Sequence, residues 1–243
     1  MGGILILDRC ALRTADWGPM VPETRYARTT DRTHVAYKVS GDGPIDVLVM
    51  RAWSSNTEND WRDPVFSGIL RRLGSIGRVV HLDRRGTGLS DRIEAGNTPT
   101  VEQRIDDMRA VLDAIGSERV VLVGLAHASA LCAVFAATYP ERTAGLIAWS
   151  PPWTVVGRDR DALISGYGDK IRAEWGTFEH AREIVRAVAP SRAEDTDFVE
   201  WIRRDHQESG TAEDAVAQPI DLVQLARQRA RQVEPEAVDV HLQ

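Results

Sequence analysis

The sequence predicts an α/β protein with a mostly parallel sheet and a helical cap, and three observations lead to that prediction. Apolar runs typical of buried strands alternate with amphipathic helical segments from about residue 45 to residue 150. Such alternation favours right-handed connections between parallel strands. From Trp153 onward the pattern is helical and highly charged, with no buried strand. The 243 residues suffice for one large domain of this kind.

The predicted sheet begins with two short strands around a turn at Thr30 to Arg32. Polar and apolar residues alternate from His34 to Val39, which is the period of a half-buried strand. A tight turn is expected at Gly41 and Gly43, because glycine tolerates positive φ. The apolar run from Ile45 to Met50 then suits a strand that is buried on both faces.

Apolar periodicity and capping residues predict the remaining elements. A polar loop leads to a short amphipathic helix over residues 64–74, with Val65 and Ile69 on its apolar side. The clearest helix begins at Thr100, whose side chain is expected to form a capping box with Gln103. The other expected strands lie at residues 78–83, 119–124 and 144–150, and the other expected helices at 127–139, 161–175, 180–190, 197–208 and 219–233.

These elements divide the chain into four expected segments. The all-helical stretch suggests a cap over the carboxyl ends of the strands, where open α/β sheets bind ligands. The segments are a loosely ordered extension (1–19), the core (20–152), the helical cap (153–234) and the start of a truncated C-terminal part of the core (235–243).

Composition excludes several classes of function. The formal net charge is -6 with both signs interleaved, so neither nucleic acid nor a membrane is expected as a partner. No apolar run reaches the roughly 18 residues that cross a bilayer. Cys10 and Cys132 lie far apart, so we expect no disulfide and a cytoplasmic location. The histidines show no metal-ligand spacing, and Asp83 to Gly88 lacks the spacing and lysine of a phosphate loop. We therefore expect no cofactor and no metal.

The segment from Val120 to Ala130, VVLVGLAHASA, suggests a catalytic setting without its nucleophile. An apolar strand ends in glycine and turns directly into a helix of small residues. Many hydrolases place a nucleophilic serine between two glycines at such a turn. Here the middle position is Ala126, whose methyl group cannot attack a substrate.

Five stretches carry a family resemblance between about Pro22 and Trp149. They are ETRYAR, VAYKVSGDGPIDVLVM, HLDRRGTGLSDR, RIDDMRAVLDAIGSERVVLVG and FAATYPERTAGLI. In this order they resemble the α/β-hydrolase family, and more narrowly the hydrolase-like domains found alone or fused to class III nucleotide cyclases. A weaker resemblance continues to Leu242. The resemblance implies an α/β-hydrolase fold.

The resemblance also implies where a catalytic site would lie. It aligns Gly124 to Ala128 with the nucleophile elbow, so that Ala126 stands inert at the nucleophile position. The backbone N–H groups of His127 and Trp53 would form the oxyanion hole. Ser129 lies one helical turn further on, and we expect its hydroxyl to bond back to the helix.

The other two members of a catalytic triad are expected to be missing. In the family the acid and the histidine follow two further strands. The sequence stops where the resemblance places the connection into the first of them, so we expect a sheet that lacks its last two strands. Asp239 and His241 come in the right order, but no strand is expected to fix them as a catalytic pair.

Aromatic residues suggest the nature of a ligand. Trp53, Trp149 and Trp153 would gather with Ser54 at the mouth of a pocket. Aromatic walls favour a small apolar or ester-like molecule, whereas ordinary core aromatics remain an equally good explanation.

Three hypotheses about function follow. The leading one is a hydrolase-fold protein without serine-hydrolase activity, which binds a small ligand or acts as a regulatory domain. The alternative is a working serine hydrolase for an ester or lactone, represented here with alanine in place of its nucleophile and without its last strands. The third is a degenerate product that folds poorly. An uncovered sheet edge would also allow a homodimer.

Overall fold

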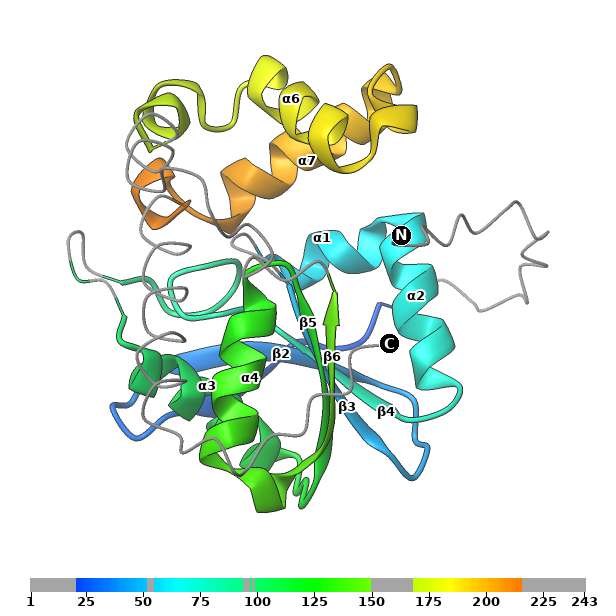
Figure 1. Cartoon of the computed structure of the whole chain (residues 1–243), viewed down its shortest axis with the longest axis vertical. Coiled ribbons are helices and arrows are strands. Elements are labelled where there is room, and N and C mark those ends of the chain that lie inside the picture. The colour runs from blue at the N-terminus through cyan, green and yellow to red at the C-terminus, as the bar shows by residue number, and fades with distance from the viewer. Residues whose placement is uncertain (1–20, 52–54, 94–96, 98, 150–167, 216–243) are drawn as a thin grey trace, which may run out of the picture.

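A six-stranded sheet lies between two layers of helices, and two more helices cover one end of the sheet (Figure 1). The computed structural model describes residues 21–51, 55–93, 97, 99–149 and 168–215. The expectations for residues 1–19, 219–233 and 235–243 lie outside these ranges.

The sheet has the strand order β1-β2-β4-β3-β5-β6. β3, β4, β5 and β6 run parallel to one another, whereas β2 is antiparallel to both of its neighbours, β1 and β4. The mostly parallel sheet predicted from the sequence is confirmed. The strands span Arg25–Arg28 (β1), His34–Ser40 (β2), Asp46–Met50 (β3), Arg78–Leu82 (β4), Val120–Leu125 (β5) and Thr143–Trp149 (β6).

The helices pack on both faces of the sheet through two hydrophobic cores. α3 and α4 cover one face, and α1 and α2 cover the other (Figure 1). α6 and α7 pack on each other through an apolar cluster of their own. The helices span Thr57–Arg62 (α1), Pro64–Gly74 (α2), Val101–Ala114 (α3), Ala128–Thr138 (α4), Phe178–Val188 (α6) and Thr196–Ser209 (α7), with short 3₁₀ turns at Pro140–Arg142 (η1) and Pro190–Arg192 (η3).

The predicted limits of α3 are confirmed by its caps. The N–H of Gln103 donates to Thr100 Oγ1 at 3.2 Å, and the N–H of Thr100 donates to Gln103 Oε1 at 2.9 Å. This reciprocal pair satisfies two N–H groups that have no partner within the helix. Beyond the helix, Gly116 adopts a positive φ of 66°, which is typical of glycine after a helix end.

Two details of the sequence prediction are wrong because distant residues decide them. β2 is not half-buried: Lys38 is enclosed, and its ammonium donates to the Pro22 carbonyl at 2.7 Å and contacts Glu58 at 2.9 Å. On α2, Val65 and Ile69 are exposed, since the helix packs through other residues. The periodicity located both elements correctly but misjudged which of their residues are covered.

One helix lies in a segment that the sequence analysis treated as a loop. α1 begins after Asn56, whose side-chain oxygen accepts the N–H groups of Glu58 at 3.1 Å and Asn59 at 3.2 Å. With six residues it is too short to display a helical apolar period. Its cap residue was the available signal.

The cap docks on the carboxyl ends of the strands. The N–H of Gly88, in the loop after β4, donates to the carbonyl of Ser209 at the end of α7 at 2.8 Å. Asp205 of α7 lies 3.3 Å from Arg51, which directly follows β3. The described helices therefore enclose the edge of the sheet where α/β proteins bind ligands. None of the described helices is long and apolar enough to cross a membrane.

Candidate functional site

The turn between β5 and α4 has the geometry of a nucleophile elbow. Ala126 at its tip adopts a positive φ of 48°, which is uncommon for a residue other than glycine. Its N–H donates to the carbonyl of Trp149 at 2.8 Å, and its carbonyl accepts the N–H of Ser129 at 3.0 Å. The expected elbow is therefore present, with a methyl group where a nucleophile would stand.

Close contact between β5 and α4 fixes this turn. A Cβ on Gly124 would lie 2.5 Å from the Cα of Ser129, so only glycine fits. The hydroxyl of Ser129 is buried and donates to the carbonyl of Gly124 at 2.7 Å. Ser129 thus has a structural bond, although its acceptor is the strand rather than the expected helix. Ala128, in place of a second glycine, is fully buried without disrupting the turn.

His127 follows the tip and begins α4. Burial, and then the nearby charge of Arg84, lower the pKa of its imidazole to about 4. The ring is therefore neutral near pH 7. With alanine at position 126, it has no hydroxyl beside it to activate.

Arg51 connects the core to the cap beside this turn. Its guanidinium pairs with Asp60 of α1 and lies 3.3 Å from Asp205 of α7. Burial would lower the pKa of Arg51, but Asp205 and Asp60 raise it above its ordinary value. Asp60 also lies 3.1 Å from Nε2 of His81, and both side chains are buried. His81 is thus a core histidine beside an acid.

The loop after β4 is held by a buried carboxylate. Asp83 accepts the N–H of Thr57 at 2.8 Å and that of Leu89 at 3.0 Å. Burial raises the pKa of Asp83 to about 6, although the N–H donors oppose the shift. Gly86 and Gly88 both have positive φ, and a Cβ on Gly88 would lie 2.4 Å from the Asp83 carboxylate. These contacts hold the backbone of the loop in place.

Two adjacent arginines in this loop have opposite surroundings. Arg85 forms ion pairs with Asp107 at 2.6 Å and with Asp31 at 2.6 Å. Arg84 is only 2% exposed, and within the described residues Nε and both terminal nitrogens of its guanidinium lack a hydrogen-bond partner. Burial, and then the charges of Arg104 and Arg51, lower the pKa of Arg84 to about 9. The local sequence does not distinguish Arg84 from Arg85.

Aromatic rings pack together within the cap. His206 of α7 stacks on Trp175, with ring centroids 4.5 Å apart and planes 14° apart. Burial, followed by the charges of His180 and Arg51, lowers the pKa of His206 to about 3.

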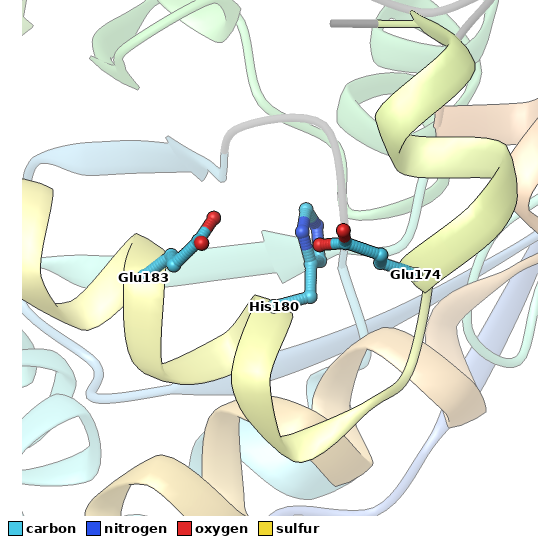
Figure 2. Close-up of side chains that lie close together, drawn as sticks. All are labelled: Glu174, His180 and Glu183. Carbon is cyan, nitrogen blue, oxygen red and sulfur yellow. The ribbon is translucent and has the colours of Figure 1, made fainter.

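Three potential metal ligands lie together on the cap. Oxygen and nitrogen atoms of Glu174, His180 and Glu183 all fall within 4.8 Å of one another (Figure 2). However, the ammonium of Lys170 lies 2.5 Å from Glu183 and 3.8 Å from Glu174. This lysine already supplies the positive charge that a metal would bring, so the group is best described as an ion-pair cluster.

The structure brings together three of the residues predicted for the site. Ala126, His127 and Trp149 meet at the elbow, where the Trp149 carbonyl holds the turn while its side chain is 64% exposed. The other predicted positions lie outside the described residues, namely Trp53, Ser54, Trp153, Asp239 and His241.

Comparison with known proteins supports the assignment of the fold. The family model of the alpha/beta hydrolase fold matches residues 51–196. Epoxide hydrolase B of Mycobacterium tuberculosis (strain ATCC 25618 / H37Rv) is 32% identical over 114 residues, which are 46% of this chain and 30% of that protein. The match therefore spans less than a third of this curated relative's length.

Solved structures agree on the fold at lower identity. A structure from a study of carboxylesterases of Nitrososphaera gargenis superposes with a TM-score of 0.64 at 17% identity, covering 84% of this chain and 76% of the other. A bromoperoxidase from Bacillus anthracis superposes with a TM-score of 0.64 at 17% identity, covering 81% and 74%. With the strand order, the elbow and the family match on residues 51–196, the chain belongs to the α/β hydrolase fold family.

Proposed function

We propose that this chain binds a small molecule at the elbow without hydrolysing it, as a ligand-binding or regulatory domain. The observation that carries the proposal is Ala126, which occupies the tip of the elbow with a φ of 48°. Serine-hydrolase chemistry requires a nucleophile at that tip, and a methyl group supplies none. The neighbouring hydroxyl, that of Ser129, is buried in a bond to the Gly124 carbonyl.

The retained geometry of the elbow argues that this place is still used. A positive φ at a residue other than glycine costs of order 1 kcal/mol, and such conformations cluster at functional sites. The elbow lies at the carboxyl ends of parallel strands and next to the cap, which is where this class of sheet binds ligands. We propose a small apolar or ester-like molecule as the ligand.

The proposal extends to the setting of the protein. Cys132 is buried, and burial raises the pKa of its thiol to about 12, so it is an inert core residue. We propose the cytoplasm as its location, because Cys132 is a free thiol among the described residues and such thiols persist in a reducing compartment. We also propose that it associates as a homodimer and that neither nucleic acid nor a membrane is its partner.

Ligand titration and an esterase assay together test the proposal. We expect the purified chain to quench its tryptophan fluorescence saturably with at least one member of a panel of small apolar compounds. It should release no p-nitrophenol from p-nitrophenyl butyrate above the buffer rate. Turnover, or the absence of saturable binding across the panel, would contradict the proposal.

A second candidate function is hydrolysis by a serine-containing parent protein. Its support is that the elbow keeps the geometry of an active nucleophile turn and that the curated relative is a hydrolase. The variant Ala126→Ser, made in the full-length protein that the gene encodes, would then cleave the p-nitrophenyl ester. Ala130→Ser, a buried position further along α4, is the matched control. An inert Ala126→Ser protein that folds would remove this candidate.

A further inference from the structure

We propose that Arg84 binds the carboxylate of a ligand at the elbow, so that the ligand carries an anionic group beside its apolar body. This inference rests on the proposed function, because it names the class of molecule that the same site takes. The observation behind it is a guanidinium that is enclosed by protein and yet has no hydrogen-bond partner in the described part of the chain.

The backbone of Arg84 is firmly held, which separates it from a loosely placed surface residue. Its N–H donates to Ser55 Oγ at 3.3 Å. Its carbonyl accepts the N–H of Thr87 at 2.9 Å and the Thr87 hydroxyl at 2.8 Å. The main chain is therefore fixed on both sides, while the charged end of the side chain is unused.

Neighbouring arginines show that this part of the fold pairs its buried cations. Arg85 has Asp107 and Asp31, and Arg51 has Asp60 and Asp205. A buried cation without a partner costs several kcal/mol of desolvation. Arg84 differs from Arg85 and Arg51 in this respect, which is what a site would show if the missing anion came from a ligand.

The position of Arg84 matches that of a ligand at the elbow. In the sheet, Val49 pairs with both His81 and Val123, so β4 and β5 end at the same edge on either side of β3. Arg84 follows β4 at that edge, close enough for its charge to act on His127. α4, an 11-residue helix, begins beside it, and a helix N-terminus favours negative charge.

The shape of the guanidinium favours a carboxylate. The cations Arg104 and Arg51 act on Arg84, and the acids Asp83 and Asp107 act in the opposite direction. A doubly charged phosphate would face these acids, whereas a carboxylate needs one charge balanced and can accept two parallel N–H bonds from one guanidinium. Among small anions, the site therefore fits a carboxylate.

Matched pairs of probes test this inference in the whole chain. Acetate, benzoate and 4-phenylbutyrate are each compared with the corresponding neutral amide by thermal unfolding and by calorimetric titration at constant ionic strength. We expect at least one carboxylate to bind more than 10-fold tighter than its amide, since a hydrogen bond to a charged group is worth that factor or more. Inorganic phosphate at the same ionic strength should bind more weakly.

Variants identify the residue responsible. Arg84→Met keeps the length of the side chain and should weaken binding of the carboxylate by about 10- to 100-fold, while binding of the amide changes less than about threefold. Arg84→Lys keeps the charge but cannot donate two parallel N–H bonds, so its affinity for the carboxylate should lie between those of the wild type and Arg84→Met. Arg62→Met, which changes an exposed arginine on α1, is the control and should behave as the wild type. Circular dichroism and the melting temperature establish that each variant is folded.

Each result decides between the inference and the proposal on which it rests. Carboxylates that bind no better than their amides, or no worse after Arg84→Met, would overturn the inference while amide binding upholds the proposed function. Phosphate binding as tight as that of the carboxylates would overturn the ligand class. No binding by any probe would overturn the inference and leave Arg84 hydrated, and the wider apolar panel would then decide the proposed function.

Discussion

A single missing Cβ at Gly124 sets the distance between β5 and α4. The Cα of Ser129 lies 2.5 Å from where that Cβ would be. The neighbouring atoms on the other side of the turn belong to the backbone rather than to a flexible side chain. We expect Gly124→Ala to lower the free energy of unfolding by about 3 kcal/mol, because strand and helix must separate. Urea unfolding followed by circular dichroism measures the change.

Gly68 on α2 provides the matched control. A Cβ there meets nothing within 4 Å, and the residue is helical. Gly68→Ala should therefore raise the free energy of unfolding by about 0.5–1 kcal/mol through helix propensity and the unfolded chain. A Gly124→Ala protein as stable as the wild type would contradict the account of the elbow.

At this scale the sequence located the elbow but not Arg84. Gly124 and Ala126 were recognisable because a strand, a glycine and a small-residue helix follow one another along the chain. Whether Arg84 has an acidic partner depends on the fold, because the nearby carboxylates of Asp107, Asp60 and Asp205 pair with other arginines. Nothing local distinguishes Arg84 from Arg85, so only the fold shows which of them lacks a partner.

At the scale of elements, Asp205 fastens α7 to the core. Asp205→Asn removes the charge that faces Arg51, and we expect it to cost about 2 kcal/mol, the worth of a hydrogen bond to a charged group. Amide hydrogen exchange should rise in α7 before it rises in β3 or β5. Glu200→Gln on the same helix breaks a surface pair with Arg203 and should cost under about 1 kcal/mol. Equal exchange in both variants would contradict the role of Asp205.

The stacked His206 makes the stability of the cap depend on pH. Its pKa is about 3 in the folded chain against 6.5 as the ordinary value, so between these values the unfolded chain binds the proton more readily. The contribution of this residue to stability is complete above pH 6.5 and is lost as pH falls, by about 1.4 kcal/mol per pH unit. Asp83 and Asp107, whose pKa values burial raises to about 6, act in the opposite direction.

A comparison of variants isolates the effect of His206 from that of the two acids. His206→Phe keeps a ring to stack on Trp175 but cannot be protonated. Relative to the wild type, it should gain about 1.4 kcal/mol in the free energy of unfolding for each unit between pH 6 and pH 4. Ile202→Val, a buried change on the same helix, should show a difference that is constant with pH. A constant difference for His206→Phe as well would contradict the buried neutral imidazole.

Most elements were predictable because their signals are local. α3 has its capping box at Thr100 and its glycine at the end, and the parallel strands are continuous apolar runs. α1 was not predicted, because a helix of six residues shows no apolar period. β2 was predicted to be half-buried, because a lysine side chain normally reaches water. Lys38 is instead covered and bonded to the Pro22 carbonyl, a partner that precedes β1.

At the scale of the whole molecule, the order of the strands could not be derived from periodicity. The arrangement β1-β2-β4-β3-β5-β6 requires crossovers between strands that are not consecutive in the chain, and only the resemblance to a family bore on the fold as a whole. One consequence concerns β6, which is an edge strand among the strands that the structure describes. Ile147 and Trp149 on this strand are 52% and 64% exposed, although they lie next to the buried β5.

An apolar edge strand is a template for pairing with another chain. We expect the protein to form a dimer about a twofold axis at β6, with the two edges antiparallel, because a symmetric contact of this kind closes on itself. Sedimentation velocity over a range of concentrations measures it. Ile147→Lys should give a monomer, because each copy would bring a charge to the shared edge. Ile69→Lys changes an equally exposed isoleucine on α2 and should leave the dimer intact. A wild-type chain that remains monomeric at the highest concentration would contradict the dimer. An Ile69→Lys chain that also dissociates would contradict the placement of the contact at β6.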